Sequence, residues 1–114
     1  VLGCTIVSND VDASPVRNAK PAEIEQAREY VLAACLADKY PESPLAAEAE
    51  VWAGGLVERG TLKGQVYPEL AQLARTLAPA VQASQSGVPM LMKSCVALYN
   101  SPVLRRTIVR LLSR

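Results

Sequence analysis

Residues 21–40, which read PAEIEQAREYVLAACLADKY, decide the fold of this chain. Pro21 is typical of a first helical position, and Tyr40-Pro41 is an expected end, because the residue before a proline disfavours helical backbone. Between these limits the apolar residues recur at steps of three and four. They are Ile24, Ala27, Val31, Ala34 and Cys35. This spacing predicts one amphipathic helix with a single apolar face.

The same period continues through the rest of the chain. Ser43-Pro44 and Ser101-Pro102 each place a capping serine before a proline at the first helical position. We expect further helices over about 44–60, 66–81, 90–99 and 102–112, with Pro79 a candidate to kink or weaken the end of the helix over 66–81. Residues 1–20 lack the period and are predicted to form an extended arm, so residues 21–114 make up the helical domain. The predicted fold class is all-α, a single-domain bundle of about five helices.

Two glycines, Gly54-Gly55, interrupt the second of these helices. Each costs about 1 kcal/mol relative to alanine in a helix interior. We therefore expect a close backbone contact there that offsets the cost. Trp52 shares the apolar stripe of the same helix, so it is expected either in the core or as an anchor for a partner.

Composition excludes several classes of function. The chain has 114 residues, a net charge of +1 and no histidine, so it lacks the basic excess that nucleic-acid binding requires. No run of eighteen apolar residues could span a membrane. Without imidazole, Ser-His-Asp and Cys-His catalysis are impossible within this chain. The acidic pairs Glu23/Glu25 and Glu48/Glu50 are two residues apart and point to different sides of a helix. We predict a non-enzymatic binding protein with no cofactor and no metal site.

Three cysteines, Cys4, Cys35 and Cys95, have neither C-x-x-C spacing nor histidine partners, which excludes zinc and thioredoxin-type chemistry. Cys35 and Cys95 fall on the inner faces of two predicted helices. The spacing alone fits either a disulfide or two buried thiols. Cys4 ends the sequence Val1-Leu2-Gly3-Cys4, which looks like the end of a bacterial lipoprotein signal. Cys4 is thus a lipidation candidate, a stray cysteine or half of an interchain bridge.

The strongest internal loop signal is Ser84-Gln85-Ser86-Gly87-Val88-Pro89. Gly87 permits a tight turn, and the polar neighbours could pair with backbone in a partner's groove. The loop could equally be an idle connector.

Four segments together resemble the type VI secretion amidase immunity proteins, specifically the group paired with the fourth amidase family. The segments are Tyr30–Leu36 (YVLAACL), Ala53–Gly60 (AGGLVERG), Ser86-x-x-Pro89, and Met92–Ser101 (MKSCVALYNS). The match spans about residues 22–112. Ser94 is a departure, because members of this family tend to carry lysine directly before the second cysteine.

The resemblance implies a periplasmic helical protein, often a homodimer, that neutralises a peptidoglycan-cleaving cysteine amidase by plugging its active site. It implies a Cys35–Cys95 disulfide, and it makes the loop residues Ser84, Gln85, Ser86, Gly87 and Val88 the first choice for the plug.

The rival hypothesis is a helical envelope lipoprotein that acts as a structural or adaptor protein, anchored through Cys4. A small enzyme that uses carboxylates is the least favoured reading.

Overall fold

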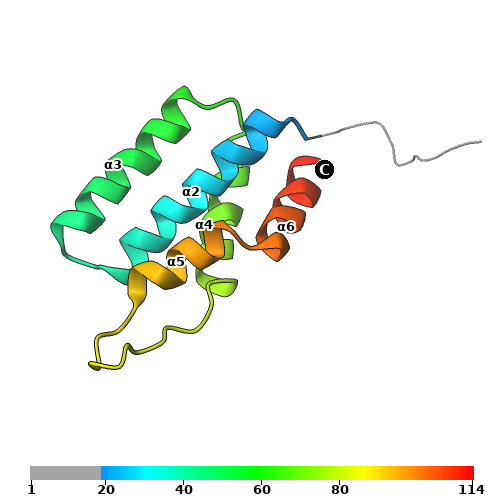
Figure 1. Cartoon of the computed structure of the whole chain (residues 1–114). Helices are drawn as coiled ribbons and strands as arrows, with labels where there is room; N and C mark the ends of the chain where they lie inside the picture. The colour runs from blue at the N-terminus through cyan, green and yellow to red at the C-terminus, as the bar shows by residue number, and fades with distance from the viewer. Residues whose placement is uncertain (1–18) are drawn as a thin grey trace, which may run out of the picture.

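The structure is a computed structural model, and it describes residues 19–114. Within that range the chain forms five α-helices (Figure 1). Their bounds are α2 Pro21–Lys39, α3 Pro44–Arg59, α4 Val66–Thr76, α5 Leu91–Tyr99 and α6 Pro102–Leu112. The predicted all-α fold of about five helices is therefore confirmed. Cys4 and most of the predicted arm lie outside the described residues.

The helix starts follow the local chemistry that the sequence indicates. The Ser43 hydroxyl accepts a hydrogen bond from the Ala46 N–H at 3.1 Å, and the Ser101 hydroxyl accepts one from the Leu104 N–H at 3.2 Å. Each serine thereby satisfies an N–H group that has no partner within its helix.

The predicted end of the third helix was wrong. Val81 was placed inside that helix, but α4 ends at Thr76. Its last turn closes with the Leu77 N–H donating to the Leu73 carbonyl at 2.9 Å. Pro79 disfavours helical backbone at the residue before it, so the helix cannot continue through residue 78. The connection to α5 is therefore longer than expected, over residues 77–90.

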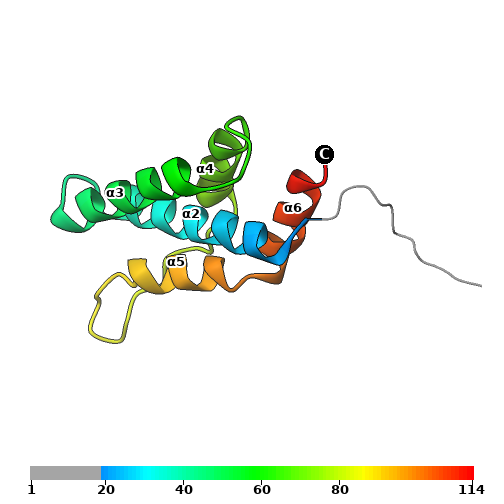
Figure 2. The same cartoon turned by 90° about the horizontal axis from the view of Figure 1, so that it is seen from above.

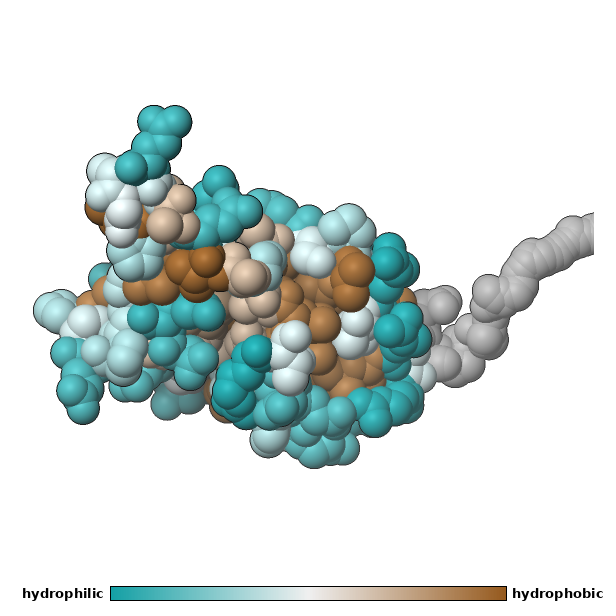
Figure 3. All heavy atoms as spheres, turned by 90° about the horizontal axis from the view of Figure 1, so that it is seen from below, coloured by the Kyte–Doolittle hydropathy of each residue, from teal (hydrophilic) through white to brown (hydrophobic). Residues whose placement is uncertain are grey.

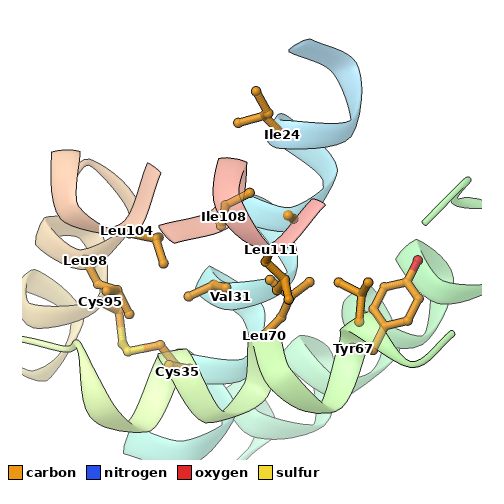
Figure 4. Packing of buried hydrophobic residues seen from close by; sticks show 13 residues of the cluster. Ile24, Val31, Cys35, Tyr67, Leu70, Cys95, Leu98, Leu104, Ile108 and Leu111 are labelled. Atoms are coloured by element: carbon orange, nitrogen blue, oxygen red, sulfur yellow. A yellow bond between two sulfur atoms is a disulfide. The ribbon is translucent and has the colours of Figure 1, made fainter. Parts of the chain in front are cut away.

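α2 is the central helix, and each of the other four packs against it. In Figure 2, α3 and α5 lie alongside α2 on opposite sides, while α4 crosses the bundle and α6 covers the end where α2 begins. The core cluster draws on every helix except α3 (Figure 4). Its buried members are Ile24, Ala27, Val31, Cys35, Val66, Tyr67, Leu70, Ala74, Cys95, Leu98, Leu104, Ile108 and Leu111.

α3 packs on α2 through small residues rather than through the main core. Its buried residues are Ala46 and Ala49, and Ala33 of α2 is buried as well. Trp52 is only half-buried, and its indole N–H donates to the Glu29 carboxylate at 3.4 Å. Trp52 therefore covers the junction between two helices and is not part of the core cluster.

The expected close contact at Gly54-Gly55 was also wrong. A Cβ added at Gly54 would meet nothing within 4 Å, and one at Gly55 would meet only the flexible end of Arg59. The crowded glycine is Gly60 at the end of α3, where a Cβ would collide with the Leu56 backbone carbonyl and fall 2.7 Å from the Gln26 side-chain oxygen. The φ of Gly60 is −83°, so glycine is required there by space rather than by a left-handed backbone.

Cys35 and Cys95 form a disulfide, with Cα atoms 5.7 Å apart. It joins α2 to α5 inside the core, and the two residues are 1% and 0% exposed (Figure 4). The predicted pairing is confirmed. Because the bridge is buried, soluble reductants have little access to it in the folded protein.

None of the helices in residues 19–114 combines the length and the apolar character that crossing a lipid bilayer would require.

We expect the disulfide to contribute about 4 kcal/mol to the free energy of unfolding, because a long closed loop lowers the entropy of the unfolded chain. Urea denaturation of the Cys35→Ala, Cys95→Ala double variant measures this difference. When thiols of the parent chain are labelled in denaturant without reductant and mapped by mass spectrometry, Cys35 and Cys95 should be unlabelled. Labelling of both would contradict the bridge.

Candidate functional site

The segment 77–90 between α4 and α5 projects from the helical body (Figures 1 and 2). The tip comprises the five residues that the sequence analysis selected as partner-binding candidates. Gln85, Ser86, Gly87 and Val88 are exposed, and Ser84 is half-buried. We refer to residues 84–88 as the loop tip.

Ser84 organises the loop tip with four hydrogen bonds, one of them between its hydroxyl and the Ser86 hydroxyl at 2.9 Å. Its N–H donates to the Val88 carbonyl at 2.8 Å, and its carbonyl accepts from the Gly87 N–H at 2.9 Å. Its hydroxyl accepts from the Val88 N–H at 3.0 Å. Gly87 has a φ of +86°, in the left-handed region that favours glycine. The tip is therefore a closed turn with a defined shape.

The stem below the tip is also paired. Ala83 and Pro89 form an isolated antiparallel bridge, and the Met90 N–H donates to the Gln82 carbonyl at 2.8 Å. At the base, the buried Ser94 of α5 donates its hydroxyl to the Pro79 carbonyl at 2.6 Å. Ser94 adjoins Cys95, so the loop base is attached next to the disulfide.

A second contact fixes the far end of α5 to α2, and the sequence analysis missed it. The Arg28 guanidinium donates to the Tyr99 carbonyl at 3.2 and 3.0 Å and lies 4.1 Å from the centre of the Tyr99 ring. Arg28 also pairs with Glu25 at 2.7 Å, and the Tyr99 hydroxyl donates to the same carboxylate. We call Glu25, Arg28 and Tyr99 the α2–α5 clamp. No sequence pattern joins residues 71 positions apart, so nothing in the sequence indicated this contact.

Exposed apolar side chains adjoin the loop, and these too were missed. Val88 is 56% exposed, while Met92 and Val96 of α5 are 48% and 46% exposed. Met92 and Val96 are one helical turn apart, so they share the outer face of α5. Exposed methionine and valine beside a protruding loop are typical of a surface that binds another protein.

Exposed polar and apolar side chains make up the surface at and beside the loop tip. Residues 19–114 contain no group of three or more acidic or cysteine side chains placed to hold a metal ion. The two carboxylates of the Glu23/Glu25 pair accept separate hydrogen bonds, from the Thr61 hydroxyl and the Tyr99 hydroxyl. A rigid helical scaffold that presents an ordered loop defines a class of small protein-binding proteins.

The comparison with protein families gives the particular family. Residues 25–108 match the model described as type VI secretion system (T6SS), amidase immunity protein, also called Tai4. This match covers most of the chain, and the protein belongs to that family. No curated protein matches the chain in a sequence search. The resemblance stated from the sequence is thereby confirmed, whereas the rival hypothesis rests on Cys4, which lies outside the described residues.

The α2–α5 clamp predicts a dependence of stability on alkaline pH. The hydrogen bond to Glu25, followed by burial, raises the pKa of the Tyr99 hydroxyl above its usual value of about 10. The neutral phenol is thus favoured in the folded state. The stabilisation from this hydrogen bond is complete at pH values below the pKa of Tyr99 in the unfolded chain. It is lost as the pH rises through the higher pKa of Tyr99 in the folded protein.

We expect Tyr99→Phe to lower the free energy of unfolding by about 1–2 kcal/mol at neutral pH. The difference from the parent should shrink above pH ~10, where Tyr99 ionises. Urea denaturation across this pH range measures it. Tyr40→Phe is the control, because no hydrogen bond of the Tyr40 hydroxyl is found among the described residues. If the difference in free energy of unfolding between Tyr99→Phe and the parent stays constant with pH, the role of the Tyr99 proton is contradicted.

Proposed function

We propose that this protein neutralises a peptidoglycan-cleaving cysteine amidase by inserting its loop tip into the enzyme's substrate groove. The observation that carries this proposal is the exposed, internally hydrogen-bonded turn at residues 84–88. An amidase groove accommodates an extended peptide, so a narrow turn flanked by two chain segments is a suitable size to fill it. Membership of the immunity family supports an amidase as the target.

The order of the tip supports tight binding. Ordering a flexible residue costs about 1–2 kcal/mol of backbone entropy, and a loop that is already closed does not lose this amount again on binding. Ser84 and Gly87 close the tip in the free protein. The bond from Ser94 to Pro79 and the neighbouring disulfide transmit the rigidity of the core to the loop base.

The apolar side chains beside the tip supply the second part of the proposed interface. Val88 belongs to the tip, and Met92 and Val96 continue along α5. We propose that the tip enters the groove while these side chains pack against its rim. Apolar contacts at the centre and polar contacts around them are the common arrangement of protein interfaces.

We propose that inhibition proceeds by occlusion alone, without a reaction catalysed by this protein. The chain has no histidine to act as a general base, which supports a binding role. We also propose a periplasmic location, where cell-wall amidases act. The Cys35–Cys95 disulfide supports an oxidising compartment, because disulfides persist there and are rare in the cytosol.

The tip is tested with a type VI secreted cysteine amidase and the Gln85→Ala, Ser86→Ala, Val88→Ala triple variant. We expect the dissociation constant to rise at least about 30-fold, since central interface residues contribute about 2 kcal/mol or more. Calorimetry measures the binding, and survival of cells that co-express both proteins in the periplasm measures protection. Circular dichroism should show unchanged helicity.

Lys63→Ala, Gln65→Ala is the matched control, because both residues are exposed in the connection between α3 and α4. This variant should bind and protect like the parent. Equal affinity of the triple variant and the parent would remove the tip from the mechanism. Gly87→Ala keeps the side chains of Gln85, Ser86 and Val88 but strains the left-handed backbone at residue 87. Weaker amidase binding by the Gly87→Ala single variant would therefore indicate that the shape of the turn matters.

We further propose a homodimer formed through the outer face of α3. Val51 is 77% exposed there, and Gly54 leaves open space beside it. An exposed glycine permits the backbone of another helix to approach closely, which gives Gly54 a role that the single chain does not explain.

We expect Val51→Glu to convert the dimer to a monomer, because the interface would bury a charge. Light scattering coupled to size-exclusion chromatography measures the mass. Val103→Glu is the control, since Val103 is a 48% exposed valine on α6. A parent protein that is monomeric at high concentration would overturn the dimer without affecting the loop proposal.

A further inference from the structure

The charges of the described chain are divided unevenly between its two halves. Residues 19–65 carry five basic and eight acidic side chains, a net charge of −3. Residues 66–114 carry six basic side chains and one acidic side chain, a net charge of +5. The overall charge of +1 conceals this division.

Four of the six basic residues lie on or directly after α6. Arg106, Arg110 and Arg114 follow one another at four-residue steps, with Arg105 beside them, and all four are exposed. Like charges at this spacing destabilise a helix. Of these four arginines, Arg114 alone has an acidic partner among the described residues, Glu69 at 2.5 Å. The helix therefore concentrates positive charge that the described part of the fold leaves largely uncompensated.

An apolar groove of about 690 Å³ lies beside these arginines, between α4 and α6. Leu73 and Leu111 contribute apolar side chains to it. Arg110, Arg114 and the acidic partner of Arg114, Glu69, line it too. Figure 3 shows this side of the molecule, where apolar surface is bordered by hydrophilic residues. We call the groove and the four arginines the α4–α6 face.

We propose that the α4–α6 face binds the surface of an anionic phospholipid bilayer. Arginine guanidinium groups pair with phosphate through two parallel hydrogen bonds, and a row of them matches a plane of phosphate headgroups. The groove provides an apolar surface next to that row, which suits the upper part of an acyl chain. Clusters of four or more basic residues are the usual signal for anionic lipid.

The composition of this face favours a lipid surface over an acidic protein. Six of the seven charged side chains in residues 66–114 are basic, so the surface complements a continuous layer of anionic headgroups. The arginines also spread over about half of the helix circumference, which suits a diffuse layer of negative charge.

The position of this face is compatible with the proposed loop function and does not depend on it. The loop tip projects at one end of the molecule, and α6 lies toward the other (Figure 1). The loop tip and the four arginines therefore occupy different ends of the molecule.

Co-sedimentation of the full chain with vesicles tests the proposal, using phosphatidylglycerol mixed with phosphatidylcholine. We expect binding at low salt, release at high salt, and no binding to vesicles of phosphatidylcholine alone. Each arginine near an anionic surface should raise partitioning about fivefold, so Arg106→Gln, Arg110→Gln should lower it about 25-fold. Lys39→Gln, Arg59→Gln removes the same charge from α2 and α3 and should bind like the parent.

Three results would overturn the proposal: no sedimentation with phosphatidylglycerol vesicles, equal sedimentation with both kinds of vesicle, or equal losses in the two variants. The arginine variant should also bind the amidase with unchanged affinity. If the arginine variant loses amidase binding and the parent does not bind vesicles, the α4–α6 face is a protein interface instead. The vesicle assay contains no amidase, so its outcome is separate from that of the loop experiment.

Discussion

The packing of four helices around α2 is the constraint on which the rest of the structure depends. One apolar stripe of α2, from Ile24 through Val31 to Cys35, meets α4, α5 and α6, while its alanine-rich side receives α3. Half of the sequence is apolar, but it contains no phenylalanine, so the core depends on close approach of aliphatic side chains. A polar residue introduced into the stripe would disturb three helices at once.

The loop takes its geometry from this central helix through a short series of contacts. Cys35 holds Cys95 covalently, the neighbouring Ser94 holds the Pro79 carbonyl, and the clamp at Arg28 holds the last turn of α5. α5 is thus attached to α2 at two levels, one covalent and one polar. Few of these groups are exposed, so the residues that support the loop are largely separate from those that the tip presents to solvent.

Local chemistry explains which parts of the fold could be predicted from the sequence. The helices and the Ser43 and Ser101 caps were predictable because each depends on residues within one turn. The spacing of Cys35 and Cys95 left their pairing open, and only the family resemblance indicated it. The end of α4 was misplaced because Leu77 and Val81 keep the helical period although Pro79 interrupts the backbone. The charged face of α6 was visible as four arginines, but their meaning depends on which sides neighbouring helices leave open.

The positions of the two bridged cysteines also determine when the disulfide can form. Its two cysteines are 60 residues apart, in the first and fourth helices of the domain. If the chain reaches the proposed periplasmic location from its N-terminus, Cys35 arrives well before Cys95, so the disulfide can form only when most of the chain has arrived. A copy retained among reducing thiols would lack it, and its fourth helix would rest on non-covalent packing alone. Full rigidity is in this way reserved for molecules that have reached an oxidising environment.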